Sequence, residues 1–177
     1  KKQGMSPKLY ILAVMILCAV CARPQAAYAQ PDSLTRLYDE GKASFSRNDY
    51  NSALKRLLEY ISAEERRKSH DTARLTDAYY IIGGVYSVYS DFAQALEIYK
   101  KGYALSLAAG DEKMQFRFLN NMIGASCDIK AADNADRLNE KVKSLKSIDK
   151  GLRAYYYNFN KGFIAGSRGD DSSKAAA

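Results

Sequence analysis

The stretch "YYIIGGVYSVYSDFAQALEIYKKGY", residues 79–103, decides the fold predicted for this chain. Its aromatic and aliphatic residues recur at helical spacing on both sides of a polar turn: Tyr79, Ile82 and Tyr86 before it, and Phe92, Leu96 and Tyr99 after it. Two adjacent glycines, Gly83 and Gly84, stand in the middle of the first helix. A glycine inside a helix costs about 1 kcal/mol relative to alanine. We therefore expect another helix to approach closely at Gly83.

The pattern around Gly83 recurs along the chain. Each of the first three copies places one residue twelve positions before an alanine: Gly41 and Ala53, Gly83 and Ala95, and Ile123 and Ala135. Gly162 begins a fourth copy, in which Lys174 takes the alanine position and Ala175 comes one place late. Successive copies are offset by 42, 40 and 39 residues. Because bulk would separate two antiparallel helices where they cross, we expect the two positions of each pair to face each other.

The periodicity predicts an all-α chain. Proline is absent after Pro31, so nothing interrupts a series of helical hairpins. The expected helices span residues 33–47, 50–64, 71–89, 92–108, 112–129, 132–146, 150–167 and 171–177. The last of these is only two turns long when the chain ends, and we expect the array to continue. Without a partner helix, Phe159 and Phe163 should be partly exposed.

At these residues the chain resembles the tetratricopeptide repeat family. The second copy carries the resemblance through Tyr79, Ile82-Gly83, Tyr86, Asp91-Phe92, Ala95, Tyr99 and Gly102, and the first through Leu37, Gly41, Phe45, Asn48-Asp49-Tyr50, Ala53 and Leu57. The third and fourth copies match less well. The resemblance implies a right-handed superhelical solenoid of about three and a half repeats, at residues 34–64, 76–108, 116–146 and, incompletely, 155–177. It implies that the residues that pack the repeats together are Gly41, Ala53, Gly83, Tyr86, Ala95, Tyr99, Ala135 and Gly162.

The resemblance also implies a concave groove, lined by the first helix of each repeat, that binds a peptide or protein segment. The groove positions carried over from the family are Tyr38, Lys42, Phe45, Tyr80, Ser87, Val88, Arg117, Asn120, Gly124, Asp128, Tyr156, Phe159 and Phe163. Asn121 and Asn160 share one position of the repeat, where some relatives hold a peptide backbone; a bond to their own helix is the alternative. Lys42 and Arg117 are similar to the basic clamp that certain relatives close on a C-terminal carboxylate.

The N-terminus has the pattern of a secretory signal. Lys8 precedes an uncharged apolar run over residues 9–22, and Ala27-Tyr28-Ala29 fits the rule for signal cleavage. We expect cleavage near Ala29, an array over residues 30–177, and a periplasmic or secreted protein. Retention of the run as an anchor is the alternative.

Composition argues against several functions. Four lysines and arginines lie in residues 1–29, so the net charge of +7 falls to +3 in the remainder, which is not typical of nucleic-acid binding. His70 is the only histidine and lies in a polar connector, so no metal cluster or catalytic constellation is predicted, and no cofactor. Cys127 is the single cysteine after residue 29 and is expected to fill core space.

These features predict a protein that binds other proteins and is not an enzyme. The resemblance implies the periplasmic sensory part of a longer signalling regulator. A surface glycan-binding protein of nutrient uptake and a non-catalytic region of a larger enzyme are the alternatives. The absence of tryptophan is unfavourable to sugar stacking.

Overall fold

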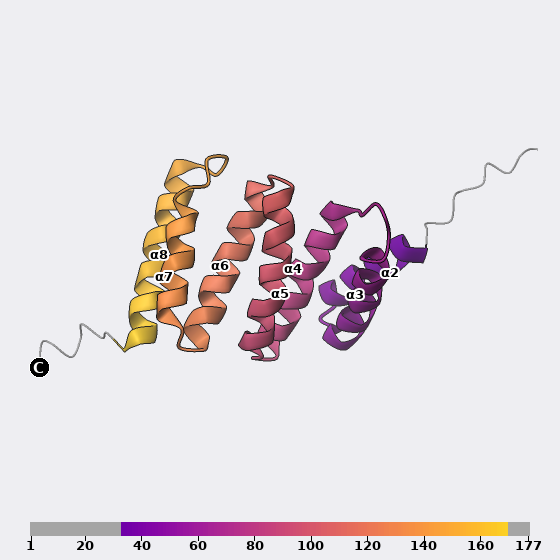
Figure 1. Ribbon diagram of the computed structural model, residues 1–177. Helices are drawn as coiled ribbons and strands as arrows, with labels where there is room; N and C mark the ends of the chain where they lie inside the picture. Colours follow the sequence, from indigo (N-terminus) through magenta and orange to yellow (C-terminus); the bar gives the residue numbers. More distant parts are fainter. Residues whose placement is uncertain (1–32, 170–177) are drawn as a thin grey trace, which may run out of the picture. The chain divides into compact units, whose positions relative to one another are not determined.

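The computed structural model describes residues 33–169, which form seven α-helices and no strand (Figure 1). The helices are α2 (Ser33–Ser46), α3 (Tyr50–Glu64), α4 (Thr72–Val88), α5 (Phe92–Ala108), α6 (Glu112–Asp128), α7 (Ala132–Val142) and α8 (Lys150–Arg168). The all-α prediction is confirmed for these residues. The predicted signal segment and the predicted helix over 171–177 lie outside the described residues.

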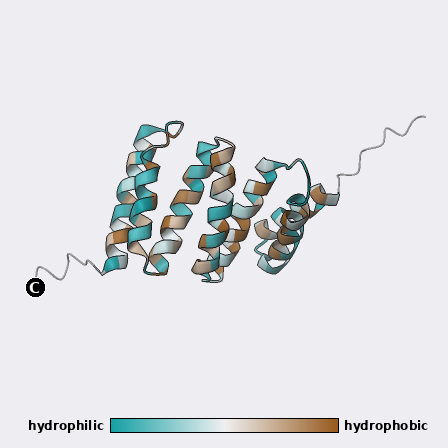
Figure 2. Cartoon of the chain, in the orientation of Figure 1, coloured by the Kyte–Doolittle hydropathy of each residue, from teal (hydrophilic) through white to brown (hydrophobic). Residues whose placement is uncertain are grey.

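The seven helices stand side by side in chain order (Figure 1). Each helix packs on the next, and the alternate helices α2, α4, α6 and α8 also contact one another in sequence. Hydrophobic and hydrophilic residues alternate along the helices, as amphipathic packing requires (Figure 2). The arrangement is repeat-like, because the same contacts recur from one helix pair to the following pair.

The turns between helices repeat as closely as the helices do. A residue with positive φ lies two positions after the end of α2, α4, α5 and α6 in turn: Asn48, Ser90, Gly110 and Lys130. The residue after each is the N-cap of the next helix, and in three of the four cases it is an aspartate whose carboxylate accepts the N–H three residues on. Such caps stabilise a helix by about 1 kcal/mol each. The exception is Ala131, which offers α7 no side-chain cap.

Helix α7 is shorter than the sequence predicted. It ends at Val142 rather than at residue 146, and residues 143–149 form a connector in which Leu145 and Ile148 are buried. The carboxylate of Glu112, in the first turn of α6, accepts the N–H of Ser147. Leu145 and Ile148 therefore add buried apolar side chains to the packing of the C-terminal helices. A longer α7 would place these two side chains elsewhere.

The crossing glycines make room for large side chains. A Cβ at Gly83 would lie within 2.8 Å of three ring atoms of Tyr99, and one at Gly41 within 2.8 Å of two side-chain atoms of Leu57. The twelve-residue spacing predicts Ala95 opposite Gly83, but the three nearest atoms belong to Tyr99, one helical turn further along α5. Ala95 is itself fully buried. Gly83 is therefore needed because the Tyr99 ring occupies the space that a side chain would fill.

The other predicted packing residues divide into two groups. Ala53, Ala95 and Ala135 are completely buried, and Tyr86 is partly buried against the core. Gly162 on α8 is exposed, with no atom within 4 Å of its Cβ position.

Helix α8, the last helix of the described residues, carries exposed aromatic side chains. Phe159 and Phe163 are 58% and 44% exposed, which confirms the expectation that they would be partly exposed.

Candidate binding face of α2, α4, α6 and α8

At the N-terminal end of the predicted groove, the polar side chains bond to one another across two helices. The Tyr38 hydroxyl donates to Asp77 Oδ2 at 2.6 Å, and Lys42 Nζ lies 3.1 Å from the same oxygen. Tyr38 is almost fully buried, and burial, together with the Asp77 bond, raises the pKa of its hydroxyl. Tyr38 and Lys42 therefore join α2 to α4, which leaves them little capacity for a ligand.

The middle of the face is aromatic. Tyr80 packs edge-on against Phe118, with ring centroids 5.7 Å apart, and the Arg117 guanidinium lies 5.5 Å from the Tyr80 ring centroid. Phe45, from α2, is partly buried and would be 3.9 Å from a Cβ at Gly84. These predicted residues therefore meet on neighbouring helices. Arg117 forms no ion pair with any residue between 33 and 169.

Two asparagines predicted to line the groove, Asn120 and Asn160, form hydrogen bonds within the chain. Asn160 is only 4% exposed, and its Nδ2 donates to Asn120 Oδ1 at 2.9 Å and to Asn139 Oδ1 at 3.0 Å. Asn120 in turn donates to the Phe116 carbonyl of its own helix at 2.9 Å. Both amide hydrogens of Asn160 are therefore used to join α6, α7 and α8. Donating a hydrogen bond to a peptide carbonyl would require Asn160 to break one of these bonds.

Asn121 has a different hydrogen-bond partner, the hydroxyl of Tyr99. Burial raises the pKa of the Tyr99 hydroxyl, and hydrogen bonds with Ser87 and Asn121 oppose that rise. The Ser87 hydroxyl also donates to the Gly83 carbonyl at 3.0 Å. Val88 and Asp128, further along the same helices, are exposed. The structure does not bring these last two residues into the aromatic cluster.

Helix α8 contributes the most exposed aromatic surface of the described chain. Tyr155 is 61% exposed and stacks on Phe159, with centroids 6.2 Å apart and planes 15° from parallel. Tyr156 lies on the inner side, edge-on to Phe116 of α6 at 5.2 Å. This pairing of Phe116 with Tyr156 connects the aromatic surface of α8 to that of α6.

A pocket of about 480 Å³ opens between α6, the 143–149 connector and α8. Its lining combines aromatic, aliphatic and charged side chains: Lys113, Phe116, Arg117, Ser147, Ile148, Asp149, Leu152 and Tyr156. Asp149 is engaged, because its Oδ1 accepts the Leu152 N–H at 2.9 Å. Hydrogen bonding to Ser147 holds the pKa of the neighbouring Glu112 carboxyl below its usual value. The lining carries two cations, Lys113 and Arg117, neither of which is ion-paired within the described chain, and one carboxylate, that of Asp149.

Sequence reasoning found two residues of this pocket, Arg117 and Tyr156, and missed the others. Lys113 and Leu152 each lie one helical turn before one of these two, so the signal was present in the spacing. Ile148 falls between the two expected helices, 132–146 and 150–167, and was missed because no groove position of the repeat lies in a connector.

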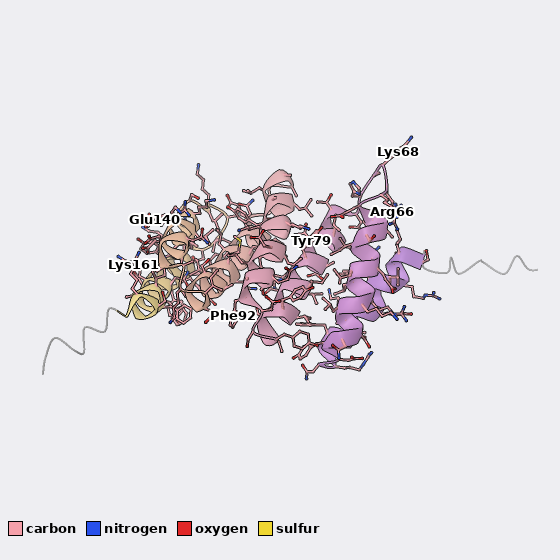
Figure 3. The ribbon with its side chains drawn as sticks, turned by 60° about the horizontal axis from the view of Figure 1, so that its bottom comes forward. Arg66, Lys68, Tyr79, Phe92, Glu140 and Lys161 are labelled. Carbon is pink, nitrogen blue, oxygen red and sulfur yellow. The ribbon has the colours of Figure 1, made fainter. Side chains whose placement is uncertain are left out.

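His70 and Cys127 are the single histidine and the single cysteine of residues 33–169, and both are residue types that often act in catalysis. The His70 ring Nδ1 is 2.7 Å from the Glu64 carbonyl, in a connector from which Arg66 and Lys68 project (Figure 3). Cys127 is buried, and burial raises the pKa of its thiol, which lowers its reactivity. Among residues 33–169 no group of three histidine, cysteine or acidic side chains is placed to hold a metal ion. Within the same range, no helix has the length and apolar character that a membrane span requires.

Comparisons with models of protein families, with curated proteins and with solved structures found no match. The function is therefore inferred from this chain's own residues.

Proposed function

We propose that this chain is a non-catalytic scaffold that binds a peptide or protein segment along the face of α2, α4, α6 and α8. In this proposal the helices form a tetratricopeptide-like, right-handed solenoid of about three and a half repeats. Support comes from the recurring turns and from the crossing residues Gly41 and Gly83, which each receive a large side chain from the following helix. A row of stacked helix pairs supplies an extended surface suited to segments of other chains.

The observation that carries the proposal is the pocket between α6 and α8 together with the aromatic surface beside it. Its volume of about 480 Å³ suits one or two side chains of a bound segment. Leu152, at its edge, is 44% exposed, and Tyr155 and Phe159 continue the apolar surface along α8. Exposed aromatic clusters of this kind are typical of interaction sites.

The setting in which the scaffold works is proposed from the sequence alone. The apolar run at residues 9–22 and the Ala27-Tyr28-Ala29 site favour export to the periplasm or the medium. An exported scaffold with no catalytic residues fits the sensory part of a signalling regulator, in which ligand binding at this face is the input.

A peptide-display selection against the full chain tests the binding function. We expect peptides to be enriched that bind the wild type and lose binding to Leu152→Asp. The matched control is Leu107→Asp, because Leu107 is 51% exposed on α5 and lies outside the pocket. Failure to enrich any peptide, or equal loss in both variants, would overturn the proposal.

A further inference from the structure

The two cations at the α6–α8 pocket lie on one side of α6. Lys113 and Arg117 are one helical turn apart, so their side chains lie next to each other along the helix. Arg117 is also held by the Tyr80 ring, 5.5 Å from its guanidinium carbon, and its Nη1 approaches Met114 Sδ at 3.9 Å. Neither contact neutralises the positive charge. The pocket is thus bordered by two cations and one carboxylate, that of Asp149, so its lining is net positive.

Apart from Ser147 and Asp149, the rest of the pocket lining is made of aromatic and aliphatic side chains. Phe116 and Tyr156 meet edge-to-face at 5.2 Å, and the buried Ile148 closes the pocket on the connector side. The connector is held in place by the Glu112 carboxylate, which accepts the Ser147 N–H. A rigid apolar wall beside a pair of cations favours a ligand that has both an apolar body and an anionic group.

A second pocket, on α8, provides a comparison for the charged side chains of the α6–α8 pocket. It has a volume of about 310 Å³ and is lined by Lys143, Lys150, Arg153, Ala154 and Tyr157. Lys143 and Tyr157 both bond to Glu140 at 2.7 Å, and Arg153 donates to the Lys143 carbonyl at 2.8 Å. Most of its polar groups are therefore engaged within the chain, whereas Lys113 and Arg117 are not.

We infer that the α6–α8 pocket binds an acidic side chain of a peptide together with an adjoining large apolar side chain. The carboxylate is held by Arg117 and Lys113, and the aromatic or aliphatic side chain packs against Phe116, Leu152 and Tyr156. A charge-assisted bond to a guanidinium beside an apolar wall is stronger than one in open water. This inference rests on the proposed binding function and specifies its ligand.

Peptide chemistry gives the first test. Fluorescein-labelled twelve-residue peptides with a central Glu-Phe-Glu are titrated with the full chain and followed by fluorescence anisotropy. We expect binding to weaken at least about tenfold when both glutamates become glutamine, and similarly when the phenylalanine becomes alanine. Amidation of the peptide's C-terminus should change affinity less than about twofold. If amidation alone abolishes binding, the chain end is the recognised carboxylate and the inference is wrong.

Variants of the chain give the second test. Arg117→Met and Lys113→Met are each expected to weaken the Glu-Phe-Glu peptide about tenfold, while Arg117→Lys, which keeps the charge, should lose less. Lys55→Met is the matched control, because Lys55 is an exposed lysine on α3, far from the pocket lining. Circular dichroism checks that every variant is folded. Unchanged affinity in the Arg117→Met, Lys113→Met double variant would overturn the inference.

The display selection separates this inference from the proposed function. If the chain enriches peptides that are neutral or basic, or that bind the double variant normally, the scaffold function stands and the acidic ligand is wrong. If no peptide of any composition is enriched and the Glu-Phe-Glu peptide does not bind, both are wrong.

Discussion

Gly83 and Gly84 are adjacent on α4, yet their surroundings differ. A Cβ at Gly83 would come within 2.8 Å of three atoms of the Tyr99 ring, whereas at Gly84 the nearest atoms are those of Phe45 at 3.9 Å. Each glycine carries the same backbone cost of about 1 kcal/mol. The crossing of α4 with α5 explains Gly83, but no packing contact within the described chain explains Gly84.

The same contrast extends along the molecule. Gly41 and Gly102 lie beneath side chains of Leu57 and Phe118, at distances no Cβ could tolerate. Gly124 lies in the open, with no atom within 4 Å of its Cβ position. Packing therefore requires the glycines at the helix crossings. It does not require Gly84 and Gly124, which lie on the candidate binding face.

The largest effect is expected from Gly83→Ala. Because Tyr99 is only 2% exposed, its ring cannot move aside, and the methyl group should lower the free energy of unfolding by about 3 kcal/mol. Urea denaturation of the two proteins measures the difference. The double variant Gly83→Ala, Tyr99→Leu is the control and should recover part of the loss, because the smaller side chain leaves room for the methyl group. A stability equal to that of the wild type would mean that the helices cross differently.

The second largest effect is expected at Asn160, which occupies a predicted groove position of the repeat but is buried. Asn160→Ala removes the donor shared by Asn120 and Asn139, leaving two acceptor oxygens without it, and should destabilise the chain by about 2 kcal/mol. Thermal unfolding by circular dichroism measures this loss. Asn158→Ala, at an exposed position of α8, is the matched control and should change stability little. Equal effects of the two substitutions would contradict the buried network.

How far the sequence could predict this structure depended on local signals. The bounds of α3 and α5 follow from the predicted pattern residue by residue, because an aspartate precedes and caps each helix and the apolar spacing is unbroken. The end of α7 could not be found in this way. Lys143 and Ser144 continue the helical pattern, and the turn is stabilised by the burial of Leu145 and Ile148, which is tertiary.

The candidate site was predicted less completely than the fold. Repeat positions identified Tyr80 and Arg117, which do lie together, but they also selected Asn160, whose amide is used internally. The spacing of residues on a helix indicates which face a side chain occupies. It cannot indicate whether a neighbouring helix supplies a bonding partner, and that decides whether the side chain is available to a ligand.

A third prediction concerns the turn before α7, where Ala131 offers no side-chain cap. The backbone of Ala131, with φ −97° and ψ 55°, is close to that of Asp91, with φ −85° and ψ 66°. Ala131→Asp should therefore supply the missing cap and stabilise the chain by about 1 kcal/mol, measured in urea. Ala131→Asn is the companion variant, because it caps without adding charge. If only the aspartate stabilises, the effect comes from the helix dipole or from nearby cations, and the turns are less alike than their dihedral angles indicate.

The smallest expected effect tests the neighbouring glycine. Gly84→Ala meets nothing closer than 3.9 Å, so the helix should gain about 0.5 to 1 kcal/mol in stability, opposite in sign to Gly83→Ala. The informative measurement is made on the same sample, as binding of the Glu-Phe-Glu peptide. Weaker binding in a more stable protein would mean that a ligand passes close to the backbone at Gly84, which accounts for a glycine that packing does not require. Unchanged binding would remove Gly84 from the binding face, and a loss of stability would mean that the two glycines are not in different surroundings after all.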